Sequence, residues 1–146
     1  MSSMTLKSLS HNISSLMRIN PEPHALSIKL ISILKEYRGI DWKEYVKHTN
    51  SIFANRSAID DNLSVYTFSN TQMLPLLYNE TFAYKVLRGC IRENHYNHDR
   101  VISDYSYIAA RYHNDCKNNI SLENDNDDIH TVIVGISSFN QFVQLI

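Results

Sequence analysis

The first 47 residues carry apolar side chains at the three-to-four-residue spacing of amphipathic helices. One apolar face is formed by Leu6, Leu9, Ile13, Leu16 and Met17. After the interruption at Pro21 and Pro23, a second face is formed by Leu26, Leu30, Ile33, Leu34 and Tyr37. Gly39 stands where a helix C-terminal cap belongs, and residues 42–47 could form a short third helix. The pattern therefore predicts helices in residues 1–47.

Beyond residue 50 the apolar period changes to two, which is typical of strands. The predicted strands are residues 51–59, 63–68, 81–87, 90–96, 129–136 and 139–146, with one or two more within 101–112. Gly89 would supply the tight turn of one hairpin, whereas the polar, asparagine-rich residues 114–128 predict a long exposed loop. Helices followed by a succession of short strands indicate an α+β fold that is mostly β, a sandwich or small barrel.

Composition narrows the functional classes. The chain has 146 residues, 43% of them hydrophobic, which fits a single domain with a real core. Its net charge is −1 and its basic residues do not cluster along the sequence, so we expect no nucleic-acid partner. We expect no membrane partner either, because no apolar run could span a bilayer and the N-terminal residues lack the continuous apolar stretch of a secretory signal. Cys90 and Cys116 do not make a disulfide framework, and a cytoplasmic location is the expectation.

A succession of short motifs resembles the cysteine dioxygenase family. The matching segments, in order, are Trp42–Tyr45, Arg56, Asn62–Tyr66, Lys85–Glu93 and His130–Val132. This resemblance implies N-terminal helices (1–47) packed on a small antiparallel cupin-type β-barrel (48–146). In that family the barrel holds iron through three histidines.

The resemblance also implies roles for individual residues. Arg56 corresponds to the family's arginine that binds the substrate carboxylate, and His130 corresponds to the third iron ligand. The family's His-x-His pair falls near Pro75 and Leu77, neither of which can bind a metal. The family's crosslinked cysteine and tyrosine have no counterparts at the matching positions. The resemblance therefore implies a cupin without the usual iron site.

Our first hypothesis is a metal-independent cupin that binds, and could transform, a small carboxylate-bearing, amino-acid-like molecule. Arg56 would anchor the carboxylate, and Tyr66 and Tyr78 would line the substrate. His130 and Tyr84 would move protons in an isomerisation, cyclisation or dehydration. No cofactor is then expected. The structural alternatives are an arginine on a solvent-facing strand and a histidine bonded to backbone.

Two further hypotheses compete with the first. An iron-dependent thiol dioxygenase could use a relocated metal site, for which the candidate ligands are His95, His98, His113 and His130. Alternatively, the cupin scaffold could serve a non-catalytic binding or interaction module. Homodimerisation through edge strands is compatible with each hypothesis.

Overall fold

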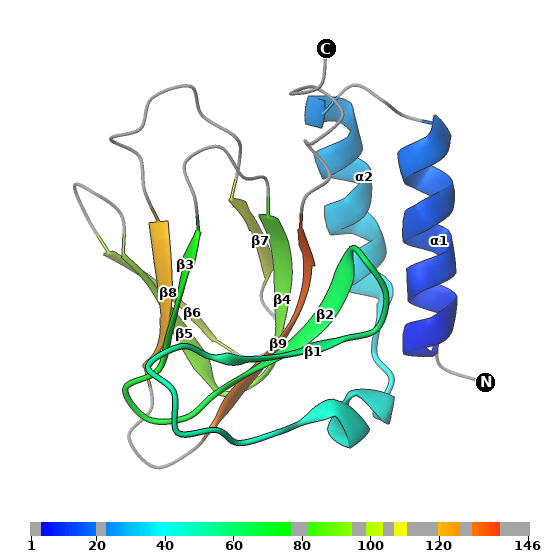
Figure 1. The fold of residues 1–146 in the computed structure, drawn as a ribbon. Helices are drawn as coiled ribbons and strands as arrows, with labels where there is room; N and C mark the ends of the chain where they lie inside the picture. Colours follow the sequence, from blue (N-terminus) through cyan, green and yellow to red (C-terminus); the bar gives the residue numbers. More distant parts are fainter. Residues whose placement is uncertain are drawn as a thin grey trace.

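A computed structural model describes residues 4–19, 23–76, 82–94, 99–103, 107–110, 120–125 and 130–137. Two α-helices, α1 (Leu6–Ile19) and α2 (Pro23–Glu36), and a 3₁₀ helix, η1 (Asp41–Tyr45), precede the strands (Figure 1). The strands are β1 (Asn55–Ala58), β2 (Leu63–Phe68), β3 (Met73–Leu76), β4 (Phe82–Arg88), β5 (Cys90–Asn94), β6 (Asp99–Ser103), β7 (Tyr107–Ala110), β8 (Ile120–Asn124) and β9 (Thr131–Ser137). None of the helices described is long and apolar enough to cross a membrane.

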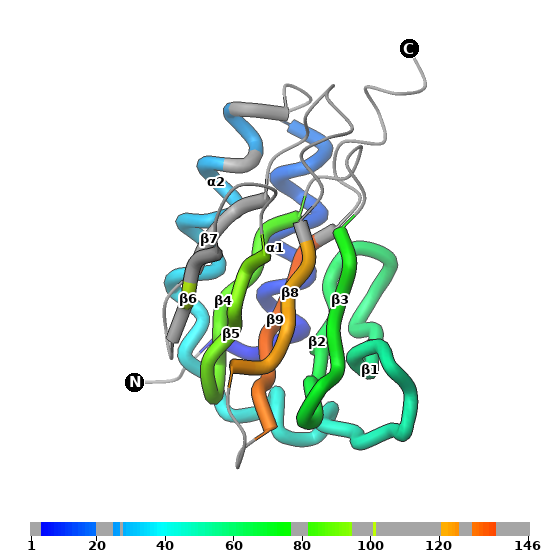
Figure 2. Tube along the Cα trace, turned by 90° about the vertical axis from the view of Figure 1, so that its left-hand side faces the viewer, coloured from blue at the N-terminus to red at the C-terminus, as the bar shows by residue number. Residues whose placement is uncertain are grey.

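The strands form two facing antiparallel sheets. One sheet has the order β1-β2-β9-β4-β7, and the other has the order β3-β8-β5-β6. The helices cover the outer face of the five-stranded sheet (Figure 1). Figure 2 looks onto the four-stranded sheet, with the five-stranded sheet and then the helices behind it. The predicted mostly-β fold with packed N-terminal helices is confirmed.

Two apolar layers stabilise this arrangement. The helix layer joins the apolar faces of α1 and α2 to outward residues of the five-stranded sheet: Leu63, Val65, Ala83, Leu87, Val132, Val134 and Ile136. The layer between the sheets contains Tyr66, Phe68, Leu76, Phe82, Tyr84, Val86, Ile91, Leu122 and Ile133. The five-stranded sheet is therefore covered on both faces, which explains why all six residues of β2 are buried.

The predicted barrel takes the form of two sheets that do not close into one continuous ladder among the described strands. At one edge they are linked by an isolated bridge between Phe53 and Met73. Here the Ala54 amide donates to the Met73 carbonyl at 2.9 Å, and the Met73 amide donates to the Ile52 carbonyl at 3.1 Å. The opposite edges belong to β6 and β7.

The prediction of a loop across residues 114–128 was wrong for its central part. Residues Ile120–Asn124 form β8, an inner strand that pairs with both β3 and β5. Only alternate positions of this strand need to be apolar, and Leu122 is fully buried between half-buried Ser121 and Glu123. Residues 139–146, expected to form a strand, lie outside the described residues.

Candidate functional site

A buried polar pair connects the two sheets. Tyr84 of β4 and Glu93 of β5 are 0% and 1% exposed, and the Tyr84 hydroxyl donates to Glu93 Oε2 at 2.6 Å. Buried hydrophobic side chains of both sheets surround the pair. Burial of a polar group costs free energy unless the group is hydrogen-bonded, so this bond holds both side chains in fixed positions. A phenol and a carboxyl group at this distance can exchange a proton.

Aromatic rings extend from this pair along the inner face of the five-stranded sheet. The Tyr66 and Phe82 ring centroids lie 5.7 Å apart at an interplanar angle of 73°, and those of Phe82 and Tyr84 lie 5.9 Å apart. Gly135 of β9 makes room for them. A Cβ atom there would lie 2.5 Å from Phe82 Cζ and 3.0 Å from Tyr66 Cε1. A side chain at position 135 would therefore displace the Phe82 and Tyr66 rings.

Arg56 lies on the same inner face, at the edge strand β1. It is directly opposite Tyr66 in the β1–β2 ladder, and paired residues point to the same side of a sheet. Arg56 Nε donates to Ser64 Oγ at 2.8 Å, while the side chain remains exposed. Among the described residues it forms no ion pair with a carboxylate. The guanidinium group is therefore positioned at the rim of the intersheet space and is accessible to an anion.

His130 lies away from this group, immediately before β9. Its exposed ring is 4.0 Å from the His48 ring between centroids, at 43°. Partial desolvation and the neighbouring His48 and Arg88 lower the pKa of His130 below its usual value. Gly135, the residue that pairs with Tyr84, is five positions further along, or roughly 16 Å at the rise of a strand. The fold does not bring His130 and Tyr84 together.

The remaining predicted site residues are Tyr78, His95, His98 and His113, all of which lie outside the described residues. Within the described ranges, no three histidine, cysteine, aspartate or glutamate side chains are grouped so that they could hold a metal ion. Pro75, which matches an iron-ligand position of the family, lies in edge strand β3, and its side chain has no atom that could bind a metal. The side chains described thus do not fit a three-histidine iron site.

Glu93 was not singled out from the sequence, although a signal for it was present. It is two positions from Ile91 in β5, so the alternation of a strand places both on the inner face. A charged residue at an inward position marks either a structural ion pair or a functional group. Its partner Tyr84 is among the site residues predicted from the sequence. The hydrogen bond between them depends on how the two sheets pack against each other.

Comparison with solved structures identifies the fold. A Klebsiella pneumoniae protein with a double-stranded β-helix domain has a TM-score of 0.56 at 14% identity, covering 72% of this chain and 92% of that one. A cupin superfamily protein from Desulfitobacterium hafniense has a TM-score of 0.50 at 11% identity, covering 68% and 88%. A Thermus thermophilus protein has a TM-score of 0.53 at 8% identity, covering 68% and 95%. No protein-family model and no curated protein matches the chain.

These similarities establish a cupin fold, also called a double-stranded β-helix, preceded by two helices. At such low identity they establish the fold alone. The finer resemblance to cysteine dioxygenases stays a prediction from the sequence, as does a cytoplasmic location.

Proposed function

We propose that this cupin-fold protein binds a small carboxylate-bearing, amino-acid-like molecule between its sheets and transforms it by acid–base chemistry without a resident metal ion. The observation that carries the proposal is the buried hydrogen bond between Tyr84 and Glu93. It places a proton donor and a proton acceptor within an apolar layer, where electrostatic interactions are strong. A buried ionisable group that faces a specific partner is a candidate functional group.

The register of the sheet supports Arg56 as the anchor for the carboxylate. Arg56 bonds to Ser64, Ser64 pairs with Gly135, and Gly135 pairs with Tyr84. Ser64 and Tyr84 therefore lie at the same level of the sheet, on strands that flank β9. At the usual spacing of neighbouring strands, their backbones are roughly 10 Å apart. A small amino-acid-like molecule held by the arginine could reach the tyrosine across this span. The Phe82 and Tyr66 rings lie over Gly135 between them and would move aside for the ligand.

The protein's part in this chemistry is the movement of protons, while the bonds that form or break, and any water released, belong to the bound molecule. Glu93, as a carboxylate, would remove a proton from the bound molecule, and the Tyr84 hydroxyl would return one at another atom. Isomerisation, cyclisation and dehydration each proceed in this way without an oxidant or a reductant. Tyr66 would contact the ligand from the inner face, and Tyr78 remains a proposed contact. His130 is not assigned to this step, since it lies at the distant end of β9.

Ligand binding tests the anchor. The protein L-amino acids and 3-mercaptopropionate would be screened by saturation-transfer NMR, and the strongest hit would be titrated calorimetrically. Loss of a bidentate, charge-assisted contact typically weakens binding about tenfold or more, so we expect this for Arg56→Gln. Arg18→Gln removes the same charge from the exposed end of α1 and should leave the affinity unchanged. Equal affinity for wild type and Arg56→Gln would remove the anchor from the account.

Proton transfer is tested separately in D₂O. If Glu93 and Tyr84 exchange a proton with the ligand, NMR should show deuterium entering the hit compound at a carbon position. Tyr84→Phe should bind the compound with similar affinity but exchange it much more slowly. Binding without any deuterium exchange would indicate a carrier or sensor of the same small molecule and would contradict the acid–base part of the proposal.

A further inference from the structure

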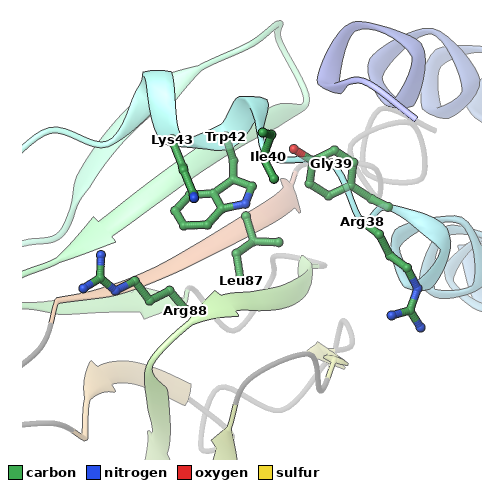
Figure 3. Close-up of a pocket in the computed structure, with 8 residues that line it drawn as sticks. Arg38, Gly39, Ile40, Trp42, Lys43, Leu87 and Arg88 are labelled. Atoms are coloured by element: carbon green, nitrogen blue, oxygen red, sulfur yellow. The ribbon is translucent and has the colours of Figure 1, made fainter. Parts of the chain in front are cut away.

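A pocket lies outside the layer between the two sheets. It has a volume of about 370 Å³ and lies where the chain leaves α2, passes through η1 and crosses the end of β4 (Figure 3). The residues that line it are Tyr37, Arg38, Gly39, Ile40, Trp42, Lys43, Leu87 and Arg88. Its volume falls within the range of about 300 to 1,000 Å³ that is usual for small-molecule sites.

The polar part of this lining is strongly basic. Arg38, Lys43 and Arg88 are cations, and no carboxylate is among the lining residues. Asp41 adjoins the lining residues Tyr37 and Gly39, but both of its oxygens accept hydrogen bonds. Oδ1 accepts from the Tyr37 hydroxyl at 2.6 Å, and Oδ2 accepts from the Leu6 amide at 2.8 Å. In a chain with a net charge of −1, this is a local concentration of positive charge that would attract an anion.

The base of the pocket is apolar and aromatic. Trp42 and Leu87 are only 8% and 5% exposed, and they lie between the cations in Figure 3. Lys43 Nζ lies 5.8 Å from the centroid of a Trp42 ring, within the distance of a cation–π contact. The indole would therefore offer a surface to a ring, while charged groups at the rim meet an acidic substituent.

The frame around the pocket is held in place by buried bonds. Lys85, which is 1% exposed, donates from Nζ to the carbonyl of Tyr37 and to that of Lys35 at 3.2 Å. These contacts fix the end of α2 to β4, as expected for a cation at a helix C-terminus. Gly39 allows the chain to approach the residues just before α1, since a Cβ there would lie 2.7 Å from the Met4 carbonyl oxygen. A backbone frame that is fixed in advance loses less entropy on binding, although the arginine side chains remain to be ordered.

We propose that this outer pocket binds a small organic anion that combines an apolar ring with a carboxylate, independently of the site between the sheets. The ring would lie on Trp42 and Leu87, and the carboxylate would meet Lys43 and the arginines. Arg38 and Arg88 extend to opposite sides in Figure 3, so their long exposed side chains would turn inward when the anion binds.

The chain provides its own reporter for this site, because Trp42 is its only tryptophan. Benzoate would be titrated while tryptophan fluorescence is recorded, with benzamide as a neutral compound of the same shape and inorganic phosphate as an anion without a ring. We expect a saturable change with benzoate that is at least about tenfold weaker with either control. An equal response to benzamide would overturn the role of charge, and an equal response to phosphate would overturn the role of the ring.

Variants locate the binding. Lys43→Gln and Arg88→Gln should each weaken benzoate binding several-fold, and the double variant should weaken it about tenfold or more. Arg18→Gln is the matched control, since it removes one exposed charge at the far end of α1. Urea unfolding would establish that each variant is folded. If folded Lys43→Gln/Arg88→Gln binds benzoate as the wild type does, or if benzoate binds without altering Trp42 fluorescence, the pocket is not its site.

Discussion

Removal of the Tyr84 hydroxyl is the perturbation that tests the intersheet pair most sharply. Tyr84→Phe keeps the ring that packs beside Phe82 and deletes only the atom that donates to Glu93 Oε2 at 2.6 Å. Both side chains are essentially inaccessible to water, so solvent cannot replace the lost donor. The substitution therefore leaves a buried acceptor with one partner fewer.

The size of the effect follows from this burial. A buried hydrogen-bonding group that loses its partner costs about 1–3 kcal/mol, and bonds to charged groups fall at the upper end of that range. The cavity contribution is small because a single oxygen is removed. We expect Tyr84→Phe to lower the free energy of unfolding by about 2 kcal/mol.

Urea unfolding, followed by circular dichroism, would measure this loss for Tyr84→Phe, Glu93→Gln and the double variant. Because the residues are in contact, the double variant should lose less than the sum of the single losses, with a coupling of about 1 kcal/mol or more. Tyr45→Phe is the matched control, since it removes the same atom from a half-buried tyrosine and should cost less than about 0.5 kcal/mol. Strict additivity, or a loss for Tyr84→Phe no larger than that of the control, would refute the reasoning.

Two further predictions concern stability. Gly89 has a φ of 91°, and a Cβ there would lie 2.9 Å from Thr131 Cα and overlap Thr131 Oγ1. Gly89→Ala should therefore lower the free energy of unfolding, measured by urea unfolding, by about 1–3 kcal/mol. The lowered pKa of His130 means that the unfolded chain binds its proton first as the pH falls. Stability should therefore decline as the pH drops below about 6.5, and His130→Gln should reduce that decline. An NMR titration in which folded His130 has an unshifted or raised pKa would contradict this.

The sequence predicted the helices and strands whose apolar periodicity can be recognised within their own residues. The apolar face of α1 leads directly to a packed helix that buries residues at the helical period. The alternation of residues 63–68 leads to strand β2, although the helices and the facing sheet bury all six of its residues. Strand β8 was missed because its polar and acidic composition resembles that of a loop. Among residues 121–124, whose burial is described, only Leu122 is buried, and the neighbouring strands β3 and β5 supply the rest of the strand's stability.

The candidate site was predictable only in part, for a similar reason. Arg56 and Tyr84 were selected individually, and the structure places both on the inner face of one sheet. Whether they lie near Glu93 depends on the strand register and on how the two sheets pack against each other. A single sequence does not specify either. The basic pocket also joins Lys43 to Arg88, residues separated by a large part of the chain. Such groupings arise from tertiary packing.

The measurement that tests the central claim most directly is the binding isotherm of the strongest carboxylate hit on protein shown to be metal-free by elemental mass spectrometry. The account predicts saturable binding by this metal-free protein, weakened about tenfold or more by Arg56→Gln. Binding that appears only after ferrous iron is added, or that is unchanged in Arg56→Gln, would contradict it.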